Sequence, residues 1–103
     1  MSQLPSLLFV MIKSPHENAN IDLVEQLGKG VKKAAILFED AVYYAVDKGQ
    51  RERLSELVDE IYVMTDDLAA RGFQGRAEGK FKEITYEEAV DVIMERYDRT
   101  ITI

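Results

Sequence analysis

The side chains best suited to chemistry follow the ends of three predicted strands. Ser14 and His16 follow the first strand, Glu39 and Asp40 the second, and Asp66 and Asp67 the third. Ligands of open parallel sheets bind outside the carboxyl ends of the strands, which meet at one edge. The chain has one histidine, and an ordinary histidine titrates near neutral pH, so His16 is the candidate proton carrier. We therefore expect these six residues to form a ligand-binding or partner-binding edge.

A simpler structural role exists for each of these residues. Asp40 and one of Asp66 or Asp67 stand where helices are predicted to begin, and aspartate is a preferred N-cap. His16 lies in a polar stretch and can be a solvated loop histidine. Ser14 and His16 are two residues apart with no third group indicated, which argues against a hydrolase triad. The capping and the ligand-binding interpretations both stay open on the sequence alone.

Several kinds of chemistry are excluded by composition. The 103 residues include no cysteine and one histidine. The sequence therefore offers no disulfide, no thiol or persulfide chemistry and no zinc site of the multi-histidine type. Gly28-Lys29-Gly30 comes at the end of a predicted helix, where a phosphate-binding loop does not occur. We expect no metal, no cofactor and no catalysis by this chain itself.

The elements that position these residues alternate between strands and helices. Continuous apolar runs at Leu7–Ile12, Ala34–Phe38 and Ile61–Thr65 are typical of strands buried on both faces. Glu83–Thr85 reads as a fourth strand, and the alternating tail Thr100–Ile103 as an edge strand. This order predicts a three-layer α/β/α fold with a mostly parallel sheet of four or five strands, as one domain over residues 1–103.

The predicted helices lie between these strands. One begins near Asn20, and a second follows Asp40 as its N-cap and is broken at Gly49. Short helical segments are predicted over Leu54–Val58 and Leu68–Arg71. The last helix has the clearest signals, because Thr85 and Glu88 match a capping box and apolar residues then repeat at helical spacing. These apolar residues are Tyr86, Ala89, Val90, Ile93, Met94 and Tyr97.

The charge of the chain limits its partners. Thirteen basic and nineteen acidic residues give a net charge of −6, which disfavours nucleic acid and anionic membranes. The longest apolar run, Leu7–Ile12, is far short of the ~20 residues that a membrane span needs, and Met1–Pro5 lacks the basic start of a secretory signal. We expect a cytoplasmic protein with no direct membrane contact, which meets nucleic acid only through a larger complex.

One segment departs from this acidic character. Residues 71–82 hold four basic residues against one acidic residue, a net charge of +3, so the other 91 residues carry −9. A basic loop with aromatic residues can contact an acidic partner or a nucleic-acid backbone. The alternative is a surface loop whose phenylalanines pack on the core. The candidate partner-loop residues are Arg71, Phe73, Arg76, Lys80, Phe81 and Lys82.

A second candidate contact surface is the pair Tyr43 and Tyr44. Both lie beside the predicted buried stripe of their helix. Tyrosine is enriched in protein interfaces, so we expect an interface there. Equally, the two rings can simply flank the core.

Several stretches, in the order in which they occur, resemble the DsrE/DsrF/DsrH-like sulfur-relay proteins. The stretch Leu37–Val42 is similar to their strand followed by a Gln/Asp-Gly-Val step, and Ala41 replaces the usual glycine. The stretch Ile61–Phe73, with Ala70-Arg71-Gly72 near its end, resembles the DsrH/TusB branch. Lys13-Ser14-Pro15 after the first strand and Ile84-Thr85-Tyr86 before the last helix also fit that branch.

This resemblance implies a parallel α/β/α fold and a subunit that assembles with DsrE/DsrF (TusD/TusC)-type partners. In that family a cysteine of the DsrE/TusD-type subunit carries persulfide sulfur, for tRNA 2-thiouridylation or sulfur oxidation. Since this sequence has no cysteine, the resemblance implies a non-catalytic subunit. The alternative is a free-standing homo-oligomer of the same fold that binds a small ligand or serves in assembly.

Overall fold

Five strands form one parallel sheet in the computed structural model, which describes residues 6–13, 21–27, 29–73, 75, 77 and 80–103. The strand order is β4-β3-β2-β1-β5, and all four neighbouring pairs run parallel. The predicted α/β/α fold with its C-terminal edge strand is therefore confirmed. The strands are β1 (Leu7–Met11), β2 (Lys33–Leu37), β3 (Glu60–Met64), β4 (Phe81–Ile84) and β5 (Arg99–Thr102).

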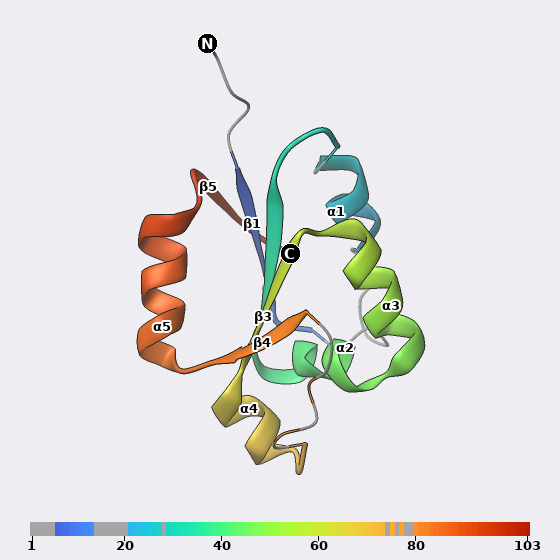
Figure 1. Ribbon diagram of the computed structural model, residues 1–103, viewed down its shortest axis with the longest axis vertical. Helices are drawn as coiled ribbons and strands as arrows, with labels where there is room; N and C mark the ends of the chain where they lie inside the picture. Colours follow the sequence, from blue (N-terminus) through green and yellow to red (C-terminus); the bar gives the residue numbers. More distant parts are fainter. Residues whose placement is uncertain (1–5, 14–20, 28, 74, 76, 78–79) are drawn as a thin grey trace.

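The helices divide unequally between the two faces of the sheet. Helices α1 (Ile21–Leu27), α2 (Tyr43–Val46) and α3 (Lys48–Leu57) lie on one side, and α5 (Tyr86–Asp91) lies on the other (Figure 1). Helix α4 (Thr65–Ala70) extends from the carboxyl end of β3. A 3₁₀ turn, η1 (Glu39–Val42), precedes α2, and a π-helical turn, η2 (Val92–Arg96), continues α5.

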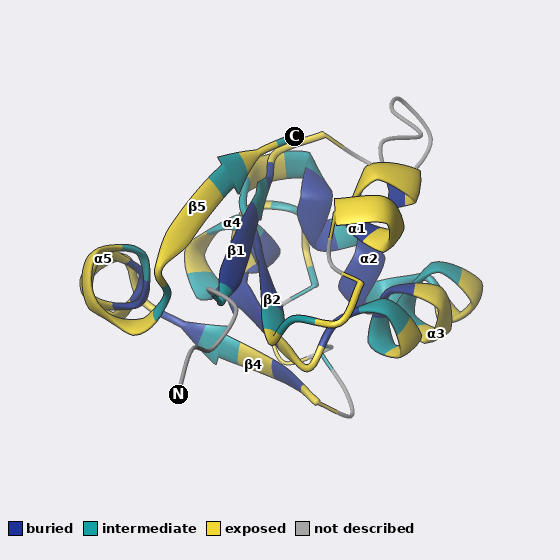
Figure 2. Ribbon diagram, turned by 90° about the horizontal axis from the view of Figure 1, so that it is seen from above, coloured by how far each residue is buried: buried dark blue, intermediate teal, exposed yellow. Residues whose placement is uncertain are grey.

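Each face of the sheet has its own hydrophobic core. Phe9 and Leu37 point into the larger core, while their neighbours Leu8 and Ile36 point into the smaller one, as the two-residue alternation of strands requires. Ala89 of α5 and Val92 of η2 close the smaller core. Figure 2 shows α5 apart from the other helices, with exposed residues around its outer surface. The second face therefore depends on one helical segment.

Local signals near the second strand were misleading. Gly49 does not break a helix: it lies in the first turn of α3, because Asp47 is the N-cap and its Oδ1 accepts a hydrogen bond from the Gln50 N–H at 3.2 Å. Asp40 is not an N-cap either, since it lies inside η1, whose cap residue is Phe38. The fourth strand begins at Phe81, two residues before the predicted start, because Phe81 is buried in the larger core.

The last helix begins as predicted but presents a different face. The capping box between Thr85 and Glu88 is present in full. Of the apolar residues at helical spacing, Ala89 is buried, whereas Tyr86, Val90 and Met94 are exposed. The helix thus packs on the sheet along one margin of its apolar surface.

Candidate functional site at the carboxyl edge of the sheet

Arg71 interacts with two of the acidic residues at the carboxyl edge of the sheet, Asp40 and Asp67. Arg71 follows α4, and its Nε and Nη2 donate to Asp40 Oδ1 at 3.0 and 2.8 Å. Its Nη1 donates to the Asp67 carbonyl at 3.1 Å and lies 3.9 Å from Asp67 Oδ1. The hydrogen bonds to Asp40 raise the pKa of the guanidinium above its ordinary value. Arg71, a candidate partner-loop residue, thus ties η1 to α4.

The second carboxylate of this network supports a strained residue. Asp67 Oδ2 accepts a hydrogen bond from the Glu39 backbone N–H at 2.8 Å. Glu39 has a φ of 50°, and it is the one non-glycine residue with positive φ in the part of the chain that the structure describes. A side chain in this left-handed region costs about 1–2 kcal/mol. Such strained positions cluster at functional sites.

The aspartates of the edge therefore act neither as helix caps nor as a free acidic cluster. The N-cap residue of α4 is Met64, so neither Asp66 nor Asp67 caps that helix. Asp66 is exposed, whereas Asp67 and Asp40 are bonded within the edge. Ser14 and His16 lie outside the described residues.

A shallow groove of about 390 Å³ lies beside Glu39. It joins the carboxyl ends of β1 and β2 to the start of α5, where the rings of Phe38 and Tyr86 have centroids 6.5 Å apart. Apart from Glu39, its walls are apolar side chains, so it suits an apolar group with a cationic end. The lining residues are Val10, Ile12, Phe38, Glu39, Tyr86 and Ile93.

Several of the candidate partner-loop residues make contacts within the chain itself. Phe81 is buried in the larger core, and Phe73 packs on that core with its ring edge-on to Tyr43, the centroids 5.3 Å apart. Lys80 Nζ donates to the Val58 carbonyl at 2.5 Å. Lys82 is an exposed residue of β4. Arg76 lies outside the described residues.

The tyrosine pair does not form a common exposed surface. Tyr44 is 2% exposed and lies in the larger core, where burial raises the pKa of its hydroxyl. Its side chain is therefore not accessible to a partner. Tyr43 is partly buried against Phe73.

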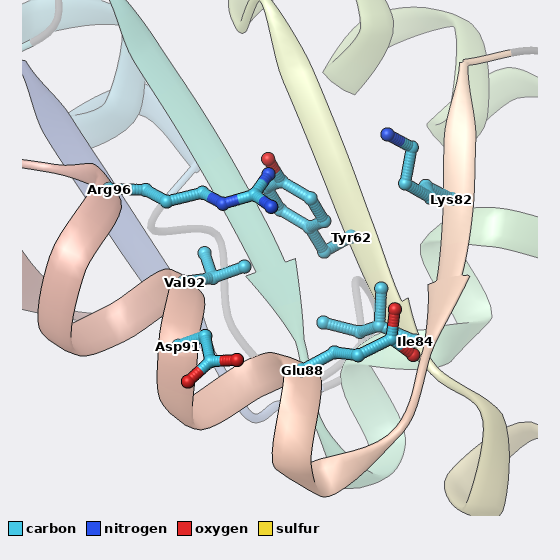
Figure 3. Close-up of a pocket in the computed structure, with 7 residues that line it drawn as sticks. All are labelled: Tyr62, Lys82, Ile84, Glu88, Asp91, Val92 and Arg96. Carbon is cyan, nitrogen blue, oxygen red and sulfur yellow. The ribbon is translucent and has the colours of Figure 1, made fainter.

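A second, smaller groove lies between the α5–η2 segment and the strands β3 and β4 (Figure 3). It holds about 130 Å³, and Lys82 and Arg96 reach over it from opposite walls. Glu88, on the helix wall, already accepts hydrogen bonds from the backbone N–H and the hydroxyl of Thr85. The groove thus has two basic and two acidic side chains along its walls, with Glu88 partly engaged and Asp91 as the second carboxylate. The lining residues are Tyr62, Lys82, Ile84, Glu88, Asp91, Val92 and Arg96.

Two tyrosines and one glutamate tie the end of η2 to the sheet beside this groove. The hydroxyls of Tyr62 and Tyr97 each donate to Glu60 Oε2 at 2.7 Å. These hydrogen bonds, that from Tyr97 first, lower the pKa of Glu60. Burial, followed by the hydrogen bonds to Tyr62 and Glu60, raises the pKa of Tyr97. Sequence reasoning missed this cluster, because nothing local indicates that residues 35 positions apart meet.

The described ranges lack both a membrane-spanning helix and a cluster of metal-ligating side chains. No helix there is long and apolar enough to cross a membrane. No group of three or more histidine, aspartate or glutamate side chains among those residues is placed to hold a metal ion.

A match to a family model shows the protein family of this chain. The family described as "DsrH like protein" matches residues 13–98, most of the chain. The chain belongs to the DsrH-like family. No curated protein matches it. The crystal structure of the YchN protein from E. coli is similar, with a TM-score of 0.79 and 14% identity over 97% of this chain and 100% of that one. At this identity the likeness shows the shared fold.

We expect Glu39→Gly to raise the free energy of unfolding by about 1 kcal/mol or less, because glycine adopts positive φ freely but loses more entropy on folding. Urea unfolding measures the change. Glu52→Gly, at an exposed site in the middle of α3, is the matched control and should lower stability by about 1 kcal/mol. Equal losses in both variants would contradict strain at Glu39.

We expect Glu60→Gln to destabilise the protein more at pH 7 than at pH 3. The folded pKa of Glu60 lies below its ordinary value of 4.5, so the stability it contributes is present above that value and is lost as the pH falls through the folded pKa. Thermal unfolding of both proteins across this range measures the difference. Tyr97→Phe removes the first hydrogen bond and should weaken the pH dependence. If Glu60→Gln lowers the stability by the same amount at every pH, the ionised carboxylate of Glu60 does not stabilise the fold.

Proposed function

We propose that this DsrH-like chain is a non-catalytic subunit of a sulfur-relay complex, supporting persulfide transfer by a Cys-bearing partner. The observation that carries the proposal is a family match over residues 13–98 in a sequence without cysteine. A persulfide forms on a thiol, so sulfur must be carried by another subunit. The partners proposed are DsrE- and DsrF-type (TusD/TusC-type) subunits in the cytoplasm.

The carboxyl edge is suited to positioning a partner. Asp40 and Asp67 each interact with Arg71, and the Glu39 backbone is fixed by Asp67. An edge that is fixed in this way presents one shape to a partner and loses little entropy on binding. The relay would then serve tRNA 2-thiouridylation, as TusB-like subunits do, or sulfur oxidation; which acceptor is used depends on the partners.

A free-standing homo-oligomer is the second candidate function. The groove of about 390 Å³ at the carboxyl ends of β1 and β2 favours it, since small ligands of open α/β sheets bind at such edges. In this case the chain would act without a cysteine-bearing subunit. The state of the isolated chain in solution distinguishes the two.

We expect the tagged chain to co-purify with the DsrE- and DsrF-type proteins of its own organism as a complex of defined mass. Light scattering after size exclusion and native mass spectrometry measure that mass. If the chain instead elutes alone as a homo-oligomer in the presence of these proteins, the relay-subunit proposal fails and the second candidate gains.

Loading the complex with persulfide sulfur tests the division of roles. The mass of the DsrE-type subunit should increase by one sulfur atom, while the mass of this chain stays unchanged. Replacing the partner's cysteine by serine is the control: it should abolish loading and leave the complex intact. Sulfur transfer that is equally fast without this chain would contradict a supporting role.

A further inference from the structure

The outer surface of α5 and η2 carries a row of large apolar side chains in contact with water. Tyr86, Val90 and Met94 are 52%, 57% and 74% exposed and repeat every four residues. We call these three residues the outer stripe. They are half of the six large hydrophobic residues that are exposed in the described part of the chain.

The packing of the helix on its own sheet does not require the outer stripe. Ala89 and Val92 fill the smaller core and Ile93 packs against it. Exposed apolar area costs about 25 cal/mol per Å² relative to buried area, and a row of three such residues on one helical segment is typical of a surface that binds another molecule. The stripe also continues into the carboxyl-edge groove, because Tyr86 belongs to both.

The charges around the outer stripe restrict what can cover it. Residues 86–96 contain four acidic residues and one basic residue, a net charge of −3, and Glu87 and Asp91 are exposed. In a symmetric dimer through this surface, the acidic margins of two copies would face each other, because the same patch is used on both. Repulsion between them disfavours a second copy and favours a partner with basic residues around its apolar centre.

The shape of the stripe indicates a helix as the contacting element. Side chains four residues apart form a ridge on a helix, and such ridges pack into the grooves of a neighbouring helix. The thioether of Met94 is flexible and adapts to an irregular partner surface. Since α5 begins beside the carboxyl edge, a helix seated on it lies next to the Glu39 groove.

We propose that the outer stripe is the docking surface for a helix of the Cys-bearing relay subunit, a helix with an apolar stripe flanked by Lys or Arg. This inference rests on the proposed function. Buried contacts of Tyr86, Val90 and Met94 supply the affinity, and Glu87 and Asp91 pair with the basic margin of the partner helix. The acidic pair thereby selects this partner over another copy of the same chain.

The test measures the affinity of the DsrE-type subunit of the same organism by isothermal titration. We expect Val90→Glu and Met94→Glu each to weaken binding roughly tenfold or more, because each places a charge in the centre of the contact. Leu23→Glu is the matched control, since Leu23 is 37% exposed on α1, on the opposite side of the sheet, and should leave the affinity unchanged. Circular dichroism verifies that the variants are folded.

A charge reversal tests the selectivity independently. Glu87→Lys with Asp91→Lys should weaken binding to the DsrE-type subunit severalfold and reduce its dependence on salt. If the wild-type chain binds and Val90→Glu and Met94→Glu bind as tightly, the docking surface is wrong and the proposed function stands. If the wild-type chain does not bind, the proposed function itself fails. If the isolated chain dimerises and Met94→Glu abolishes the dimer, a second copy is the occupant and the inference is overturned.

Discussion

A parallel sheet must be covered on both faces, and this chain covers its second face with one helical segment. Helices α1, α2 and α3 share the first face, whereas the α5–η2 segment is the only helical segment on the second face within the described residues (Figure 1). That segment has to fill the smaller core and return the chain to β5 on the far side of β1. No second helix of the described ranges lies beside it, and its outer residues Tyr86, Val90 and Met94 are exposed. The exposed outer stripe and the groove beside Tyr62 both follow from this constraint.

The carboxyl edge shows how a cluster of acidic residues can be structural. Four carboxylates follow β2 and β3, and on sequence alone they look like helix caps or ligands. In the structure Asp40 and Asp67 bond to Arg71, and Asp67 also fixes the backbone of Glu39. The favourable hydrogen bond to Glu39 offsets the cost of its positive φ. The network therefore sets the shape of the edge and leaves Glu39 as the carboxylate that lines the groove.

The sequence predicts those features whose cause is local. Long apolar runs predict β1, β2 and β3, and the Thr85–Glu88 spacing predicts the start of α5, since each pattern reports burial or capping at its own position. The prediction of a helix break at Gly49 is wrong, because the Asp47 cap three residues before Gln50 outweighs the low helix propensity of glycine. The partners of Arg71 and Glu60 were not predictable, because each bond joins residues that only the sheet order brings together.

Two of the four basic residues in positions 71–82 are bonded within the chain. Residues 71–82 carry an excess of positive charge, which points to a basic partner loop. Arg71 is paired with Asp40, however, and Lys80 is bonded to a backbone carbonyl. An ion pair that is satisfied within the chain contributes little to a partner, because it would have to be broken first. The outer stripe lies on the opposite side of the sheet from α2, which carries Tyr43 and Tyr44 (Figure 1). Under the proposed function, the outer stripe, rather than a basic loop, is the surface that a Cys-bearing subunit would contact.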